Sequence, residues 1–398
     1  MCKHNASAVK YETAVNSNEG EQKKGCAGME QVRRYRTGIL LAGSLLALFL
    51  AGIPGLGRIL ADEKPESYQA EASTAGADGN TVLLGGMPIG IYMETDGVMV
   101  LSTERMEGVD GNAHEPAANL VRTGDYITAV DHEEISGKAD LLEAVDEIDG
   151  GDVILTVRRD GETLDIRISP VECAPDEYRL GIWVRDNVQG LGTVTFLTDK
   201  SRFGALGHGI HDADTNVLMS ISDGTVYQTS IQDIIKGADG SPGSMEGIIV
   251  YNRYNVLGSI DRNTEAGIYG TIERIDELFE EQIPIETAKK EDITTGPAKI
   301  RCYIDGEIKE YDIQVTEVDT ESGQLSKGLV IQVTDPELLE KTGGIIQGMS
   351  GSPIIQNGKL IGAVTHVFVQ DSTMGYGIFI ENMLKQVESS ETSKIVSN

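Results

Sequence analysis

The sequence predicts a mostly β protein with at least two folded domains, preceded by an N-terminal transmembrane helix. Its 398 residues exceed what one hydrophobic core usually organises. Glycine is abundant at 47 residues, aromatic residues make up only 5%, and short Val- and Ile-rich runs are punctuated by Gly, Asn and Asp. This combination favours strands joined by tight turns over a helical bundle.

The charge balance excludes one class of partner. The chain carries 33 basic and 63 acidic side chains, a formal net charge of −30. Such a surface repels phosphate backbones, so we do not expect nucleic acid as a partner. The cysteines match no zinc or redox spacing. Cys173 and Cys302 follow the apolar segment described next, and they fit either a disulfide in an exported protein or two separate thiols.

An uncharged apolar segment divides the N-terminal region. Residues 1–37 are polar and end in a basic run, and we expect them to form a cytoplasmic leader. Residues 38–57 contain no charge and are long enough to span a bilayer as a transmembrane anchor. Basic residues before this segment and acidic residues after it predict that everything beyond is extracytoplasmic. A cleaved signal peptide is the alternative. Either an anchor or a signal peptide would place the same domains outside the cytoplasm.

A polar stretch leads into the first folded domain. Residues 58–80 lack apolar periodicity and are expected to be a flexible tether. Residues 81–170 contain short strand-like runs, one helical pattern that places Leu141, Val145 and Ile148 on one face, and a final hairpin. We expect a small, mostly β domain here.

The order of these runs, with the VxxGDxI turn at Val121–Ile127, resembles a PDZ domain of the kind attached to bacterial envelope proteases. In that family, a loop before the first groove strand binds a peptide's terminal carboxylate with backbone N–H groups, and the peptide adds a strand to the sheet. A small β domain that packs on its neighbour without binding peptide is the alternative. The resemblance assigns the peptide-binding loop to Gly85, Gly86, Met87, Pro88 and Ile89.

Residues 171–388 form a third block that is rich in strand-like runs. Brief helical patterns interrupt them at 231–236, 275–281, 336–341 and 382–388. Many strands at this spacing predict barrels or sandwiches rather than alternating βαβ units. Residues 389–398 are expected to be a polar tail.

The strongest local signal for chemistry is GMSGSP, Gly348–Pro353. Flanking glycines allow a sharp turn that exposes the Ser350 hydroxyl and lets successive N–H groups face one point, as an acyl-transfer oxyanion hole requires. The segment is similar to the GDSGGP segment of trypsin-like peptidases. That similarity implies a double β-barrel, with Ser350 as the nucleophile and the backbone amides of Gly348 and Ser350 as the oxyanion hole. A glycine-rich hairpin that contains serine by chance is the alternative.

A serine nucleophile needs a base within hydrogen-bond reach. Three histidines lie in the third block: His208, His211 and His366. His208 lies between two glycines at the end of a strand-like run, where a side chain can project into a cleft. His366 lies in mid-strand, where a satisfied core or sheet-face histidine is the more common outcome. We therefore favour His208 as the base.

Two longer segments, GALGHGI and TGGIIQGMSGSPIIQNGKLIGAVTHVF, resemble the SpoIVB peptidases, the sporulation stage IV serine peptidases of endospore-forming Firmicutes. An anchor, a PDZ domain and a C-terminal peptidase in this order also match that family. The resemblance implies that His208 and Ser350 are the catalytic pair and that Asp335 is the acid. Asp335 also opens a short helical pattern before Pro336, so N-capping is a competing role for it. Asp212 and Asp214 are further candidates for the acid.

The resemblance also implies a biological setting. Family members act in the space between the forespore and mother-cell membranes, where they cleave a membrane-bound regulator of an intramembrane protease and so activate a late sigma factor. They also cleave themselves near the N-terminus, under control of the PDZ domain, so the chain's own tether is an expected partner. No cofactor and no metal are implied.

Two other functions compete with the serine peptidase. The first is a non-catalytic PDZ scaffold of the cell envelope with a peptidase-like domain, which the pairing of His208 with Ser350 argues against. The second is a metal-dependent hydrolase, which the many carboxylates suggest. The sequence argues against it, because it contains no HExxH motif or comparable ligand cluster.

Overall fold

The computed structural model describes residues 80–238 and 240–387. The predicted leader, anchor and polar tail lie outside these ranges, as does the predicted tether apart from Asn80. Within the described ranges, no helix combines the length and the apolar character needed to cross a bilayer.

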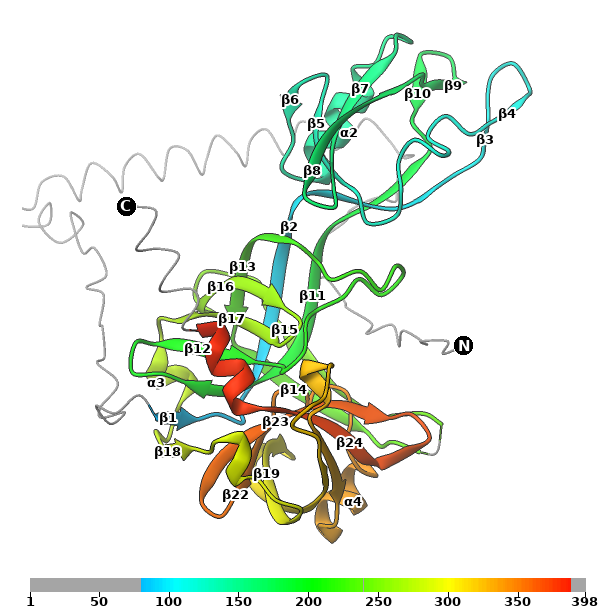
Figure 1. Cartoon of the computed structure of the whole chain (residues 1–398). Helices are drawn as coiled ribbons and strands as arrows, with labels where there is room; N and C mark the ends of the chain where they lie inside the picture. Colours follow the sequence, from blue (N-terminus) through cyan, green and yellow to red (C-terminus); the bar gives the residue numbers. More distant parts are fainter. Residues whose placement is uncertain (1–79, 239, 388–398) are drawn as a thin grey trace, which may run out of the picture. The chain divides into compact units, whose positions relative to one another are not determined.

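The first barrel is a closed ring of antiparallel strands (Figure 1). Hydrogen-bonded pairing runs from β2 to β11, β12, β17, β16 and β13, and returns to β2. Its interior holds buried apolar side chains such as Ile89, Ile91 and Phe203. The bounds of the strands are β2 (Pro88–Thr103), β11 (Ile182–Leu197), β12 (Arg202–Ala205), β13 (Ile221–Tyr227), β16 (Val256–Thr264) and β17 (Gly267–Ile272).

The second barrel is closed in the same way. Pairing runs from β19 to β20, β21, β24, β23 and β22, and returns to β19. Ile300, Ile331 and Val364 lie in its core. The bounds are β19 (Gly296–Ile304), β20 (Glu307–Val318), β21 (Leu329–Val333), β22 (Pro353–Gln356), β23 (Lys359–Phe368) and β24 (Asp371–Phe379). The predicted mostly β double barrel is therefore present.

Two short strands connect the barrels. β1 (Thr81–Leu84) pairs with β11 of the first barrel and with β18 (Pro284–Thr287), and β18 pairs in parallel with β23 of the second. Short helices occupy the connections: α3 (Ile275–Leu278), η2 (Lys290–Asp292), η3 (Leu325–Lys327), α4 (Pro336–Thr342) and the helical residues 380–387.

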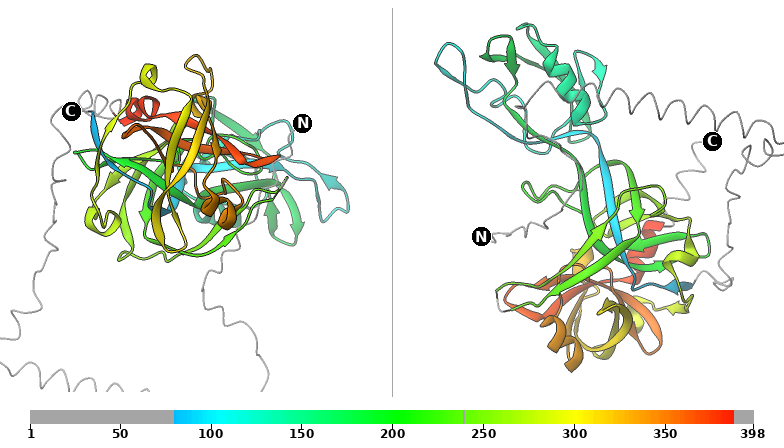
Figure 2. Two further views of the ribbon diagram at one scale, coloured as in Figure 1. Left: turned by 90° about the horizontal axis from the view of Figure 1, so that it is seen from below. Right: turned by 180° about the vertical axis from the view of Figure 1, so that it is seen from behind.

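Two long strands extend from the first barrel into a smaller domain. Figures 1 and 2 show β2 and β11 side by side as they leave the barrel, and their antiparallel pairing continues from Pro88–Thr193 to Thr103–Ile182. The small domain has its own core, which includes Val98, Ile127 and Leu155. Its further elements are β3 (Met106–Glu107), β4 (Ala113–His114), β5 (Tyr126–Val130), β6 (Glu133–Glu134), α2 (Lys138–Asp146), β7 (Val153–Arg159), β8 (Glu162–Ile168), β9 (Val171–Ala174) and β10 (Glu177–Arg179).

This arrangement differs from the domain boundaries expected from the sequence. Residues 81–95 were expected in the small domain, but Leu83, Ile89 and Met93 pack in the first barrel. Residues 180–184 were expected in the peptidase, yet Leu180 packs in the core of the small domain. The physical reason is that β2 and β11 each serve two cores, so the small domain is inserted into the barrel.

The segment at 231–236 is a strand rather than a brief helix. β14 (Thr229–Ile235) pairs with β15 (Ser244–Ile249) in a separate hairpin. Its isoleucines suit a pleated surface, and the partner strand satisfies backbone groups that a single helical turn leaves unpaired. The hairpin also meets the loop before Ser350, because Gln347 N donates to Gly243 O and Met245 N donates to Gln347 O.

Candidate active site

The loop that carries Ser350 joins α4 to β22. Gly348 and Gly351 adopt φ values of 101° and 95°, a region that favours glycine. A Cβ on Gly351 would lie 2.1 Å from Thr193 O and 2.5 Å from Leu206 N. Only glycine therefore allows the loop to lie this close to the first barrel. Gly351 follows Ser350 directly, and Gly348 precedes it by two residues.

Strand β11 of the first barrel fastens this loop. Thr193 N donates to Ser350 O at 3.1 Å. The Thr193 hydroxyl donates to Gly348 O at 2.8 Å, and the Thr195 hydroxyl donates to Gly351 O at 2.7 Å. Both threonines are almost fully buried. Sequence reasoning missed them, and their only signal is the Thr-Val-Thr alternation inside an otherwise apolar run.

The backbone amides around Ser350 divide into two groups. Met349 N donates to Ile346 O, and Gly351 N donates to Val364 O. Gly348 N and Ser350 N, by contrast, donate to no acceptor within the described residues. These two amides remain available to an oxyanion, and they are the pair that the sequence assigned to the oxyanion hole.

His208 lies three residues beyond the end of β12 and is half-buried. Its Nδ1 is 2.9 Å from Gly209 O. A carbonyl oxygen can only accept, so Nδ1 carries the proton, and Nε2 of the neutral ring is the free proton acceptor.

The surroundings of His208 favour the neutral imidazole. Burial lowers the pKa of His208 below its ordinary value of 6.5. The hydrogen bond to Gly209 O opposes this shift, the nearby His211 lowers the pKa further, and the negative charge of Glu265 raises it. The net shift is downward, so His208 is a neutral base at neutral pH.

One segment of β23 contacts both predicted catalytic residues. The pairing of β23 with β24 shifts register between Val364 and Val367, and His366 is exposed there. The His366 ring lies 4.6 Å from the His208 ring, centroid to centroid. The Ser350 hydroxyl donates to Thr365 O at 2.8 Å. The structure thus brings Ser350 and His208 to one place, with the hydroxyl turned to Thr365 rather than to the imidazole.

Asp335 is not placed at His208. It is the N-cap of α4, where Oδ1 accepts from Glu337 N at 2.9 Å and Leu338 N at 3.1 Å. Its Oδ2 accepts from Asp312 N at 3.2 Å. Three backbone amides therefore occupy this carboxylate, and the capping role that the sequence left open is the one that the structure supports.

The other two candidate acids are also engaged. Asp212 is buried, forms an ion pair with Arg185, and accepts from Asp214 N and Thr215 N. The Asp214 carboxylate pairs with Arg185 at 2.8 Å. Both carboxylates stabilise the turn after His208.

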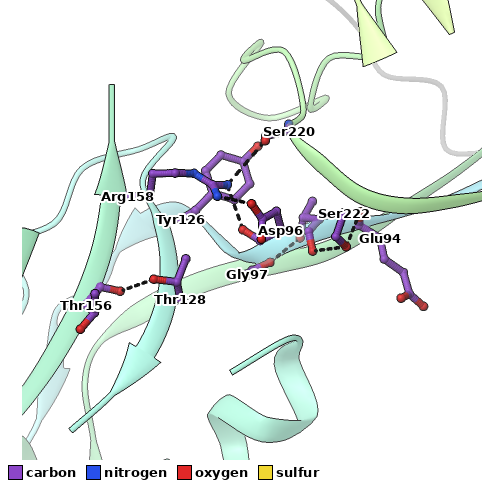
Figure 3. A network of polar contacts seen from close by, with 10 residues as sticks. Glu94, Asp96, Gly97, Tyr126, Thr128, Thr156, Arg158, Ser220 and Ser222 are labelled. Carbon is purple, nitrogen blue, oxygen red and sulfur yellow. Dashed lines mark hydrogen bonds and ion pairs between the residues drawn. The ribbon is translucent and has the colours of Figure 1, made fainter. Parts of the chain in front are cut away.

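The loop that follows His208 ends on the small domain, as Figure 3 shows. Ser220 N donates to the Tyr126 hydroxyl at 2.9 Å. Arg158 forms an ion pair with Asp96 and donates to Asp96 O at 3.0 Å, and its guanidinium lies 5.0 Å from the centre of the Tyr126 ring. Polar contacts from the small domain therefore hold the end of the loop that follows His208.

The peptide-binding loop expected at Gly85 to Ile89 is part of the first barrel. Gly85 N donates to Thr195 O at 3.0 Å and Gly86 N donates to Val194 O at 2.8 Å. Met87 and Ile89 are buried in the barrel core, and Pro88 begins β2. These amides cannot bind a peptide carboxylate. The assignment is wrong because the strand after the loop feeds the barrel and not the small domain.

The small domain has a cavity elsewhere. A space of about 560 Å³ lies between α2 and the segment from β10 to the start of β11. It is lined by apolar side chains of both elements, including Leu141, Leu142, Leu180 and Trp183. Gly181, at a φ of 66°, stands just before β11. A loop, a strand and a helix around an apolar cavity suit a peptide that adds as a strand.

The sequence left open whether the two cysteines in the described part of the chain form a disulfide. Cys173 and Cys302 are separate thiols, and Cys302 is buried. Within residues 80–238 and 240–387, no group of three or more His, Cys, Asp or Glu side chains is arranged to hold a metal ion.

Comparison with known proteins gives two family matches. Residues 176–384, more than half of the chain, match the family described as SpoIVB peptidase S55, and residues 85–169 match the PDZ domain family. No curated protein matches the chain.

Solved structures give weaker similarities. The active form of the Rv3671c protease from M. tuberculosis is 14% identical, with a TM-score of 0.28 over 51% of this chain and 74% of that chain. The HtrA-type protease AlgW with tripeptide is 12% identical, with a TM-score of 0.26 over 50% of this chain and 56% of that chain. Scores this low establish no shared fold. The two closed barrels rest on their own strand pairing.

Proposed function

The chain belongs to the SpoIVB peptidase S55 family and is a serine peptidase, and we propose that it cleaves a membrane-bound regulator of an intramembrane protease during sporulation. The observation that carries the chemistry is the Ser350 loop, which leaves the amides of Gly348 and Ser350 without acceptors among the described residues and lies beside the neutral His208. The family supports the biological setting.

The proposed reaction begins with a rotation of the Ser350 side chain. The hydroxyl leaves Thr365 O and turns to Nε2 of His208, since catalytic hydrogen bonds are often poorly aligned until the substrate complex forms. His208 takes the proton as Ser350 Oγ attacks the scissile carbonyl carbon. The amides of Gly348 and Ser350 donate to the resulting oxyanion.

The same imidazole completes the reaction. Protonated His208 gives its proton to the leaving amine, and the new N-terminus departs. His208 then removes a proton from water as the water attacks the acyl-Ser350 ester, and it returns that proton to Ser350 Oγ as the ester C–O bond breaks and the acid product leaves. Each step uses the tautomer that the hydrogen bond to Gly209 O selects.

We place the peptidase outside the cytoplasm. The apolar segment at 38–57 has basic residues before it and acidic residues after it, which favours an uncleaved anchor with an external C-terminal part. In a sporulating cell, that location is the space between the forespore and mother-cell membranes. A membrane-bound substrate would then meet the peptidase at the same surface.

The chain's own tether is a second proposed substrate. Residues 58–80 are polar and without apolar periodicity, so this stretch can enter an active-site groove without unfolding a core. Peptide recognition by the small domain is assigned to the cavity between α2 and β11, since the loop at 85–89 belongs to the barrel.

Expression of the full-length chain and of Ser350→Ala in membranes tests both substrates. We expect the wild type to cleave a co-expressed membrane regulator and to show a new N-terminus within or near 58–80, and Ser350→Ala to do neither. Identical N-termini in the two proteins would remove self-cleavage, and an intact regulator would remove the proposed substrate.

A further inference from the structure

We propose that Glu265, in the turn between β16 and β17, is the carboxylate that positions His208 and stabilises its charged form during catalysis. Glu265 acts with the neighbouring His211. The inference rests on the proposed Ser350–His208 reaction and names a residue that neither the sequence motifs nor the family resemblance assigned.

Strand pairing brings the segments of Glu265 and His208 to the same end of the first barrel. β12 and β17 pair antiparallel, with Arg202 opposite Thr271 and Ala205 opposite Ile268. His208 follows the end of β12 by three residues and Glu265 precedes the start of β17 by two, so both leave the same end of this strand pair.

Close backbone contacts support that placement. A Cβ on Gly209 would lie 2.7 Å from Thr264 O, and a Cβ on Gly267 would lie 2.5 Å from Ala205 O. The turn that carries Glu265 is therefore packed against the segment that carries His208. Asn263 strengthens the contact, since its side chain accepts from Ile210 N and donates to Ile210 O, both at 2.8 Å.

Charge points to the same residue. The negative charge of Glu265 raises the pKa of His208, against the larger lowering by burial. Glu265 Oε1 lies 3.4 Å from His211 Nε2, and His211 Nδ1 lies 3.1 Å from Gly209 O, which also accepts from His208. His211 thus connects Glu265, which it contacts through Nε2, with the carbonyl that also accepts from His208.

The other carboxylates considered as the acid have hydrogen-bond or ion-pair partners away from His208. Asp335 accepts from three backbone amides at the start of α4. Asp212 and Asp214 pair with Arg185. The Glu265 side chain is 63% exposed, and its only partner among the described residues is His211, so it can respond when His208 becomes charged.

The chemical role of Glu265 follows from the proton path. The proton moves from Ser350 Oγ to His208 Nε2 and then to the leaving amine, while Nδ1–H of His208 stays on Gly209 O. Glu265 takes no proton. Its negative charge lowers the energy of the imidazolium that exists between the two transfers.

The test compares kcat and its pH dependence for the full-length chain in four variants. Glu265→Gln should lower kcat about 10- to 100-fold, less than the ~10⁴-fold known for loss of a buried triad acid because Glu265 is exposed. It should also move the acidic limb of the kcat/KM profile to lower pH, since a favourable charge on imidazolium is lost. Glu265→Asp should restore kcat to within about threefold of wild type, because it keeps the charge.

Two further variants make the result specific. Glu280→Gln removes an exposed carboxylate of the same kind after α3 and should leave kcat and the acidic limb unchanged. Asp335→Asn should retain kcat to within about threefold, since Asn caps a helix about as well as Asp. An unaltered acidic limb and kcat in Glu265→Gln, or a ~10⁴-fold loss in Asp335→Asn, would overturn the proposal. Labelling of wild-type Ser350 by a fluorophosphonate is the control for the proposed function. If Ser350 is labelled, a negative result for Glu265→Gln overturns only the role of Glu265; if it is not labelled, the serine-peptidase mechanism itself fails.

Discussion

Ser350 owes its position to the glycine on its C-terminal side. Gly351 combines a φ of 95° with contacts to Thr193 O and Leu206 N that leave no room for a Cβ. The hairpin turn that follows offers a matched comparison, because Gly358 has a φ of 77° and nothing within 4 Å of a built Cβ. The two glycines share a backbone conformation and differ in packing.

Gly351→Ala and Gly358→Ala should therefore differ in stability. We expect Gly358→Ala to cost about 1 kcal/mol of unfolding free energy from backbone strain alone. Gly351→Ala should cost at least about 3 kcal/mol, since it adds a steric clash between the two barrels. Chemical denaturation monitored by circular dichroism measures both values. Equal losses would mean that the loop does not pack against Thr193 as described.

The activity should fall as His208 becomes protonated. Burial lowers the pKa of His208 below 6.5, so the neutral base persists into mildly acidic solution and the rate is lost only as pH falls through that lowered value. We expect the acidic half-point of kcat/KM to lie below pH 6.5. A half-point at or above 6.5 would indicate a more exposed base.

At the residue scale, short motifs indicated the candidate nucleophile and base. The glycines around Ser350 and the pair around His208 identified segments that the structure does bring together. The acid could not be found in this way, because the proximity of Glu265 to His208 depends on the pairing of β12 with β17, which no local pattern in the sequence records.

The loop after His208 is the element on which the two domains meet. Its end at Ser220 is bound by Tyr126 and Arg158 of the small domain, and its middle is bound by Arg185 of β11 through Asp212. Binding at the small domain can therefore reach the catalytic base through a short chain of contacts.

Tyr126→Phe tests whether these contacts hold the loop. The change leaves Ser220 N without its protein acceptor, a net loss of about 0.5–1.5 kcal/mol. We expect hydrogen exchange of amides in residues 209–220 to accelerate by about 2- to 10-fold, and kcat to fall severalfold. Thr128→Val is the control, since the Thr128 hydroxyl donates to Thr156 O within the small domain. Equal exchange in all three proteins would show that the loop is held by other contacts.

At the same scale, sequence periodicity predicted most strands and misjudged one short segment. Residues 231–236 show apolar spacing that fits a helical turn, but β15 supplies a partner strand from further along the chain. Short apolar runs do not distinguish the two structures without knowledge of their partners.

At the scale of the whole described chain, residues 80–238 and 240–387 form a double barrel with a domain inserted into it. Because β2 and β11 each contribute to two cores, residues that are adjacent in sequence belong to different domains, and the first barrel is closed only after the small domain has been completed. The sequence indicated both domains and their order. It could not indicate the insertion, since polar residues interrupt both shared strands, at 94–97 in β2 and 185–187 in β11, and such interruptions resemble turns between separate strands.

The most direct test of the account is site-specific labelling of the full-length chain with a fluorophosphonate, read by mass spectrometry. We expect one adduct on Ser350 in the wild type and in His366→Asn. Labelling should be absent in Ser350→Ala and slower by about 10³-fold or more in His208→Asn, because the base is lost. An adduct on another serine such as Ser352, or wild-type labelling in His208→Asn, would contradict the assignment of Ser350 and His208 as nucleophile and base.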